Sequence, residues 1–298
     1  MDEIYIIQRK LFYKELQPLF DALSSVRYAV IKGEVLSQQI YGVPDRRRSS
    51  DIDILIDKKN VKCLEEQLHK LGFEQKLPED NAEIRRNRVL CMAYSHQIPS
   101  YHKDKLGFHF NVDVNYDIFW GEYAGKRCSI DEFLSDTIDM EIYGVTMKTL
   151  PIEKAFVQLV LHHYKEMNSL YHLSRYNSIR TYMFRDVYDL LLYKGNRLTP
   201  QSTYQIFEKY SMKDIGYYML YYTSLVFGAA FLNPYVQQLE VAKNIDLLES
   251  YGLCSKERKQ WKLTFDKRLD CDTLVEFIMK DMSTSDFEKN NRNNNIFL

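Results

Sequence analysis

The stretch that decides the fold runs from Tyr28 to Asp57 and reads YAVIKGEVLSQQIYGVPDRRRSSDIDILID. It predicts a short apolar strand, a glycine turn, a helical run, a basic turn and a second strand that begins at Asp51. Because side chains alternate along a strand, Asp51 and Asp53 project to one face and the isoleucines to the other. Two carboxylates on one face repel each other, and a hard cation such as Mg²⁺ is the usual reason to keep them together. The stretch therefore predicts phosphate chemistry at a metal site.

This arrangement resembles the nucleotidyltransferase superfamily, whose fold is shared by DNA polymerase beta and antibiotic nucleotidyltransferases. More closely, it is similar to the bacterial family of uncharacterised nucleotidyltransferases, which shows Lys-Gly, a Tyr–Pro–Arg stretch and Ser-Asp-hydrophobic-Asp. The residues that carry the likeness are Lys32, Gly33, Tyr41, Pro44, Arg48, Ser50, Asp51, Ile52 and Asp53. The likeness is strongest over 28–57, weaker to about 195 and absent beyond. Glu34 departs from it, because a second small residue usually follows the glycine.

The resemblance implies an α+β protein with two domains. A polymerase-beta-like domain with a mixed sheet is expected over 1–150. Helical patterning predicts an all-helical domain over 151–298, and the Asn-rich, polar composition of 284–298 predicts a disordered tail. The implied reaction moves a nucleoside monophosphate from an NTP to an acceptor hydroxyl and releases pyrophosphate. Two Mg²⁺ ions would be held by Asp51, Asp53 and a third carboxylate.

The third carboxylate is expected on the alternating segment from Gly107 to Tyr116. Its apolar residues share one face, and Asp113 lies on the other between Val112 and Val114. Asp113 is therefore the predicted third ligand and general base, with Asp117 as the alternative. A strand with a solvent-facing polar edge is the competing interpretation.

The nucleotide phosphates are predicted to contact the turn and the loop before the second strand. A glycine lets the backbone approach an anion closely. The predicted phosphate-binding residues are Lys32, Gly33, Arg48, Ser49 and Ser50. The resemblance adds His163 and Arg185 from the helical half, where ordinary ion pairs are the competing interpretation.

Composition narrows the choice of partners. The 298 residues carry 40 basic and 41 acidic side chains, a net charge of −1, which argues against a stable duplex DNA partner. The five scattered cysteines predict neither disulfides nor a zinc site, and they suit a cytoplasmic protein. No signal peptide or membrane span is expected. The expected partners are an NTP and an acceptor that is a small molecule, a peptide or RNA.

Hydrophobic periodicity predicts the remaining elements. The sequence favours a helix from residue 3 to about 24, divided or kinked at Pro18, and another from Asn60 to Leu71. Residues 79–105 are basic and are read as a solvated hairpin, with a strand at 89–94, or else as a nucleotide-facing or RNA-facing surface. A hairpin is predicted around Gly144, and helices are predicted over 152–167, 179–194, 200–210, 214–227 and 236–250.

His162, His163 and His172 do not show the i, i+4 histidine pairing of a helical zinc site. The sequence therefore predicts no metal there.

Two other functional classes remain open. One is an abortive-infection toxin-like nucleotidyltransferase that acts on tRNA, for which only residues 85–105 offer a basic surface. The other is a non-catalytic nucleotide-binding module, against which the three candidate acids argue.

Overall fold

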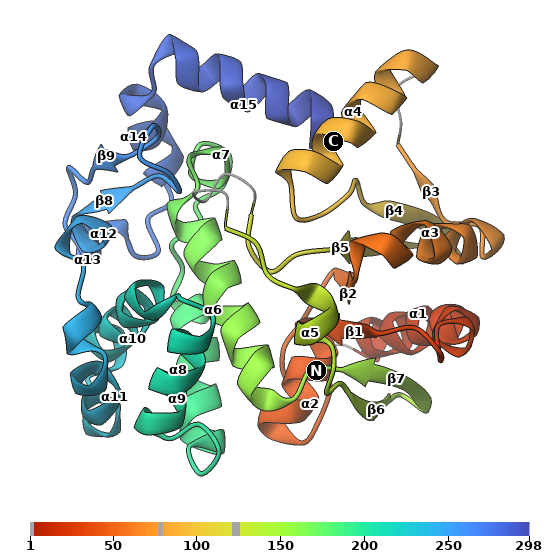
Figure 1. The fold of residues 1–298 in the computed structure, drawn as a ribbon, viewed down its shortest axis with the longest axis horizontal. Coiled ribbons are helices and arrows are strands. Elements are labelled where there is room, and N and C mark those ends of the chain that lie inside the picture. The colour runs from red at the N-terminus through yellow and green to blue at the C-terminus, as the bar shows by residue number, and fades with distance from the viewer. Residues whose placement is uncertain (1–2, 77–79, 121–125, 298) are drawn as a thin grey trace. The chain divides into compact units, whose positions relative to one another are not determined.

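The computed structural model describes residues 3–76, 80–120 and 126–297, and these form two compact units. The first unit comprises the described residues up to 155 together with 294–297, and the second comprises 156–293. A seven-stranded mixed sheet lies in the first unit, and the second is largely helical (Figure 1). The chain is therefore an α+β protein, as the sequence predicts. The predicted domain bounds, 1–150 and 151–298, stay a prediction.

The first unit contains both helices and strands. Its helices are α1 (Glu3–Ala22), α2 (Gly33–Tyr41), η1 (Lys58–Asn60), α3 (Val61–Lys70), α4 (Asn81–Tyr94) and α5 (Ile130–Phe133). Its strands are β1 (Tyr28–Ile31), β2 (Asp51–Ile56), β3 (Glu74–Gln75), β4 (Tyr101–Lys105), β5 (Phe108–Asn115), β6 (Ile138–Ile142) and β7 (Val145–Thr149). The predicted hairpin around Gly144 is confirmed.

The sheet has the strand order β3-β4-β5-β2-β1-β7-β6. Strand β2 lies at the centre, antiparallel to β1 and parallel to β5. The register sets Asp53 opposite Ile31 on one side and opposite Asp113 on the other. The two strands that carry predicted acids are therefore direct neighbours.

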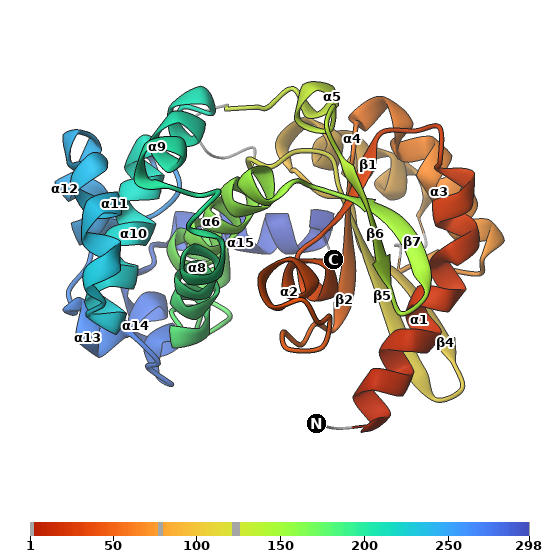
Figure 2. The same ribbon diagram turned by 90° about the horizontal axis from the view of Figure 1, so that it is seen from below.

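One face of this sheet carries the core of the unit. Figure 2 shows α1 and α3 on one side of the sheet and α2 on the other. The alternating apolar side chains of β2 and β5 pack among those of α1 and α3, and they include Ile52, Ile54, Ile56, Phe110, Val112 and Val114. The intervening side chains, Asp51, Asp53 and Asp113, project to the opposite face.

Helix α1 runs through Pro18 as one element, so the predicted division there is wrong. Its buried face includes Phe12, Leu16 and Leu19, whereas the apolar residues Ile4 and Ile7 near its start are exposed.

The predicted strand at 89–94 is also wrong, because these residues end helix α4. Asp80 caps that helix by accepting from the Ala82 N–H at 2.8 Å. Arg88 forms a two-point ion pair with Glu65 of α3, with both contacts at 2.6 Å. A cap and a tertiary ion pair therefore favour helix over strand propensity here.

The second unit contains helices joined by short loops and a two-stranded ribbon. Its elements are α6 (Ile152–Asn168), α7 (Leu170–Leu173), α8 (Thr181–Lys194), α9 (Pro200–Lys209), α10 (Lys213–Phe227), η2 (Ala230–Leu232), α11 (Asn233–Gln238), η3 (Glu240–Ala242), α12 (Ile245–Glu249), β8 (Ser250–Tyr251), β9 (Lys259–Gln260), α13 (Phe265–Arg268), α14 (Leu274–Asp281) and α15 (Thr284–Phe297). In the described parts of both units, no helix is long and apolar enough to cross a membrane.

Two predictions for this unit differ from the structure. The single helix predicted over 236–250 is broken, because Asn244 starts a new helix by accepting from the Leu247 N–H. The segment 284–298, predicted to be disordered, is helical over Thr284–Phe297. Ser283 and Asp286 cap its start through mutual hydrogen bonds, and the buried Asn290 donates to Ser174 Oγ at 2.9 Å. Caps and a buried polar contact thus stabilise a sequence with poor helix propensity.

Candidate active site

Three carboxylates lie on one face of the sheet, on neighbouring strands. The parallel pairing of β2 with β5 puts Asp53 in register with Asp113, and Asp51 in register with Asn111. Side chains in register on adjacent strands point to the same face. The structure therefore brings together the three acids that the sequence predicts.

The environment of Asp53 and Asp113 disfavours the charged forms of these two carboxylates. Asp53 is 4% exposed, and burial raises its pKa; the Asp51 charge raises it further, whereas Lys32 lowers it. Burial, together with the charges of Asp53 and Asp51, raises the pKa of Asp113 to about 6. The three negative charges thus lack full compensation from the protein.

An all-oxygen donor set with unbalanced negative charge is chemically suited to a hard divalent cation such as Mg²⁺. Among the described residues, the ligand oxygens of the three aspartates do not all lie within 4.8 Å of one another. Instead, Lys32 Nζ lies 2.7 Å from Asp53 Oδ1. An ammonium group therefore supplies the positive charge that these carboxylates favour.

Lys32 and Gly33 form an unusual turn between β1 and α2. Lys32 has φ 60° and ψ −150°. Residues other than glycine rarely adopt this backbone conformation, which costs about 1–3 kcal/mol. Gly33 has φ 43° and is the first residue of α2. The first N–H groups of a helix have no intrahelical acceptor and attract phosphate. Such strain occurs often at ligand-binding sites.

Ser49 links this turn to the carboxylates. A Cβ atom added to Gly33 would lie 3.4 Å from Ser49 Cβ, so the two segments are in close contact. Ser49 Oγ donates to Asp51 Oδ1 at 2.7 Å. Gly33, Ser49 and Asp51 are therefore adjacent, while Ser50 is exposed beside them.

A buried polar network, which the sequence does not predict, joins helix α1 to Glu34 and to the backbone of Asp51. Arg9 of α1 donates to both carboxylate oxygens of Glu34, at 2.6 and 2.8 Å, and to the backbone carbonyl of Asp51 at 2.9 Å. Tyr13 also donates to Glu34, at 3.1 Å. Arg9 and Glu34 are each 1% exposed. The sequence feature that indicates such a network is Arg9 itself, an arginine on the apolar face of α1, three residues before Phe12.

This network makes a glutamate acceptable at buried position 34. Its carboxylate forms a two-point ion pair with Arg9. Burying an unpaired carboxylate costs several kcal/mol, so the two charges must be kept together. The guanidinium in turn holds the backbone of Asp51.

Tyr5 joins the same network to the basic loop. Its hydroxyl donates to Glu34 Oε1 at 3.0 Å and accepts from the Ser49 N–H at 2.9 Å. The Arg48 guanidinium lies over the Tyr5 ring, 5.3 Å from its centre. Arg46 stacks in the same way on Tyr41. The first turns of α1 thus orient the loop that precedes β2.

Asp117, the alternative third acid, has other contacts. It is 5% exposed and accepts from the N–H groups of Phe119 and Cys128, at 2.9 and 3.4 Å. Arg127 lies 3.4 Å from its second oxygen. Burial raises the pKa of Asp117, and these contacts lower it. These contacts indicate that Asp117 stabilises the chain after β5.

His163 and Arg185 belong to the second unit. His163 on α6 is 1% exposed, and its Nε2 lies 3.1 Å from Asp186 Oδ2 on α8. Arg185 is half-exposed, with its guanidinium over the Phe227 ring at 4.2 Å. Their predicted contact with nucleotide phosphates stays a prediction.

Comparison with known proteins identifies the family. None of the curated proteins compared with the chain matches it. Among solved structures, an antigenic nucleotidyltransferase-like protein from Paracoccidioides brasiliensis covers 73% of this chain and 97% of its own, at 16% identity and a TM-score of 0.36. Likeness at that level carries no structural argument. The family profile described as uncharacterised nucleotidyltransferase matches residues 4–228. The chain belongs to the uncharacterised nucleotidyltransferase family.

Proposed function

We propose that this protein moves a nucleoside monophosphate from an NTP to an acceptor hydroxyl and releases pyrophosphate. The observation that carries the proposal is the pairing of Asp53 with Asp113 on adjacent strands, beside the strained Lys32-Gly33 turn. It combines a carboxylate group suited to Mg²⁺ with a backbone turn suited to phosphate.

Asp51, Asp53 and Asp113 would hold the Mg²⁺ ions, two in number as the family resemblance implies. When bound, such ions neutralise phosphate charge and acidify the attacking hydroxyl. Asp113 would accept the hydroxyl proton, since a carboxylate beside the attacking group is well placed for that role. The acceptor oxygen then bonds to the α-phosphorus, and the bond to the β-phosphate oxygen breaks.

The rest of the site would hold the triphosphate. The backbone of Gly33 at the start of α2 faces the phosphates without a side chain in the way. Ser49 and Ser50 offer hydroxyls, and Arg48 offers a guanidinium suited to phosphate. Lys32 binds Asp53 through an ion pair and would turn to the phosphates once other cations satisfy that carboxylate.

The tRNA-directed alternative has less support. It needs a basic surface at 85–105, yet Arg88 is paired with Glu65, and Lys103 and Lys105 are both paired with Glu15. These ion pairs reduce the positive charge available to RNA. A purely nucleotide-binding module would not need three acids on one face of neighbouring strands, and we therefore favour the enzyme.

The test is to incubate the protein with Mg²⁺, all four NTPs and separate pools of small molecules, peptides and RNA. Mass spectrometry of each pool should reveal an added nucleoside monophosphate. Asp53→Asn should reduce that transfer about 10²-fold or more, because a preorganised charge at the reacting centre is lost.

Asp139→Asn provides the matched control, since Asp139 is an exposed aspartate on strand β6 of the same sheet. It should keep full activity. Full activity of Asp53→Asn would overturn the catalytic assignment. Failure of the unmodified protein to bind any NTP would overturn the proposed function.

A further inference from the structure

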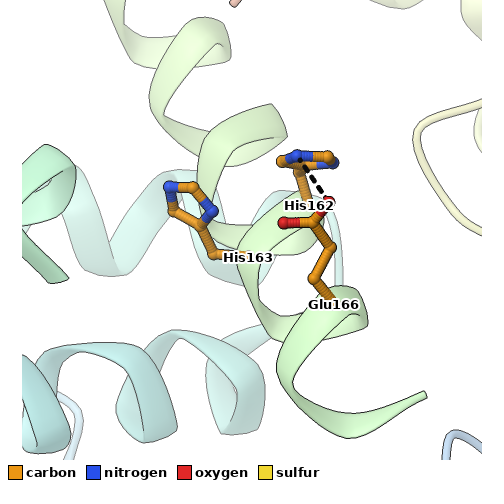
Figure 3. A group of neighbouring side chains, drawn as sticks. All are labelled: His162, His163 and Glu166. Atoms are coloured by element: carbon orange, nitrogen blue, oxygen red, sulfur yellow. Dashed lines mark ion pairs between the residues drawn. The ribbon is translucent and has the colours of Figure 1, made fainter. Parts of the chain in front are cut away.

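Three side chains that ligate metals gather on helix α6 of the second unit. They are His162, His163 and Glu166 (Figure 3), and one ligand atom from each lies within 4.8 Å of the other two. His162 Nε2 is 3.4 Å from Glu166 Oε1, one helical turn away. The sequence predicts no metal here because its histidines show no i, i+4 pairing with one another. The i, i+4 spacing is present, but between a histidine and a glutamate.

His163 is the decisive member of this cluster. Its side chain is 1% exposed, and Nε2 lies 3.1 Å from the Asp186 carboxylate. A carboxylate accepts from a ring N–H, so Nε2 carries the proton and Nδ1 keeps a lone pair. Nδ1 is buried without a hydrogen-bond partner. A buried acceptor without a partner destabilises the folded state, and a bound cation would remove that penalty.

The arrangement of Asp186 behind His163 is typical of metal sites. Histidines that bind a metal through one nitrogen almost always donate the other N–H to a carboxylate, which fixes the tautomer and raises the basicity of the ligand. The side chains of His162 and Glu166 are 17% and 24% exposed. The two partly exposed ligands therefore leave the cluster open to an ion from solvent.

We propose that His162, His163 Nδ1 and Glu166 bind one divalent transition ion of the zinc class, with Asp186 as the positioning residue. Two imidazoles and one carboxylate are a donor set that zinc favours, with a fourth position for water. Mg²⁺ prefers oxygen ligands, so this site differs chemically from the three aspartates. The proposal gives His163 a partner other than the phosphate that the sequence predicts. It does not depend on the proposed transferase activity.

The competing explanation is a pair of ordinary contacts. His162 and Glu166 would form an ion pair on the helix surface, and His163 and Asp186 a structural hydrogen bond between α6 and α8. Both contacts would exist without any ion, and neither would give stoichiometric metal binding.

The test uses Co²⁺ as a spectroscopic probe, in a full-length protein that carries Asp51→Asn and Asp53→Asn to remove binding at the aspartates. One Co²⁺ per chain should bind, with the visible absorption of a nitrogen-ligated ion, and Zn²⁺ should displace it. Glu166→Gln and His162→Asn should abolish the signal. Asp186→Asn should weaken binding about 10–100-fold, as for other residues that orient a ligand.

His69→Gln is the control for adventitious binding, because His69 is a lone exposed histidine on α3, and it should leave the titration unchanged. Circular dichroism verifies that each variant is folded. If a variant at buried His163 fails to fold, the more exposed His162 and Glu166 still decide the question. Absence of Co²⁺ binding, or equal binding by Glu166→Gln and the parent protein, overturns the proposal.

Discussion

At the scale of single residues, the position of each acid decides its role. Asp113 projects from the sheet beside Asp53, and its carboxylate accepts from Ser100 Oγ. Asp117 is only four residues further on, yet it accepts from two backbone N–H groups and faces Arg127. One acid is surrounded by like charge and the other by donors. Repulsion favours metal binding, and donors favour structural stabilisation.

Asp113→Asn should therefore abolish nucleotidyl transfer while the protein stays folded. Asp117→Asn should lower the melting temperature, because a buried acceptor of backbone N–H groups is altered, and change the rate little. Steady-state kinetics and thermal denaturation of both variants measure the two effects. The reverse pattern would move the third acid to Asp117.

At the scale of elements, helix α1 supports the catalytic face from a distance. Arg9 binds Glu34 of α2 and the backbone of Asp51 in β2, and Tyr5 binds the backbone of Ser49. Three segments that surround the site are thus joined through one helix. A shift of α1 would displace the turn, the loop and the strand together.

Tyr5→Phe keeps the ring under Arg48 but removes both the acceptor of the Ser49 N–H and the donor to Glu34. It should lower kcat/KM for the NTP about 2- to 13-fold, because the bond to Ser49, worth about 0.5–1.5 kcal/mol, is the one that orients the phosphate-binding loop. Tyr5→Leu also removes the cation–π contact and should weaken NTP binding further. In double-mutant cycles with Arg48→Ala, Tyr5→Leu should be coupled and Tyr5→Phe additive. Additivity of both would show that the stacking has no role in binding.

The loop before β2 supplies a second comparison. Arg48→Ala should weaken NTP binding by about 1.5–3 kcal/mol, the typical value of a charge-assisted hydrogen bond. Arg46→Ala should cost much less. Both arginines are exposed, but Arg48 stacks on Tyr5, which binds Ser49 beside the carboxylates, whereas Arg46 stacks on Tyr41 of α2. Isothermal titration with a non-hydrolysable NTP analogue and Mg²⁺ measures both. If both variants lost equally little NTP affinity, the phosphates would not be bound by this loop.

At the scale of the whole molecule, the clustered acids make stability depend on pH and on cations. The pKa of Asp113 rises from 3.8 to about 6 on folding, so the folded protein binds protons more tightly than the unfolded chain. A raised pKa stabilises the folded state fully below pH 3.8 and loses that effect as the pH rises through 6. The site is thus less stable at neutral pH without a cation.

Asp113→Asn should therefore be more stable than the unmodified protein at pH 7.5 in EDTA, by roughly 2–3 kcal/mol in the free energy of unfolding. The difference should vanish below about pH 4, where both side chains are neutral. Mg²⁺ should raise the melting temperature of the unmodified protein at pH 7.5 and not that of Asp113→Asn. Denaturant titrations over pH, with Asp139→Asn as control, test this. A stability that rises between pH 4 and 7 because of Asp113 would contradict it.

The sequence by itself determined the elements whose signals are local. The alternation of Asp51 to Ile56, the glycine turn before α2 and the hairpin at Gly144 all depend on neighbouring residues, and the structure has them as predicted. The identity of the candidate acids also follows from alternation, because a period of two fixes which side chains share a face. The same motifs predict the family, and the profile match over residues 4–228 confirms it.

Tertiary structure alone decided what depends on partners distant in the chain. The register that pairs Asp53 with Asp113 joins strands with long intervening segments, and no local pattern sets it. The ion pair of Glu65 with Arg88 stabilises α4 where a strand is predicted. Asn290 of the last helix is held by its hydrogen bond to Ser174. The ion pair with Arg9 compensates the burial of the Glu34 charge. The physical reason is the same in each case: the free energy of a buried charge or amide depends on its partner, and only folding brings that partner within hydrogen-bonding distance.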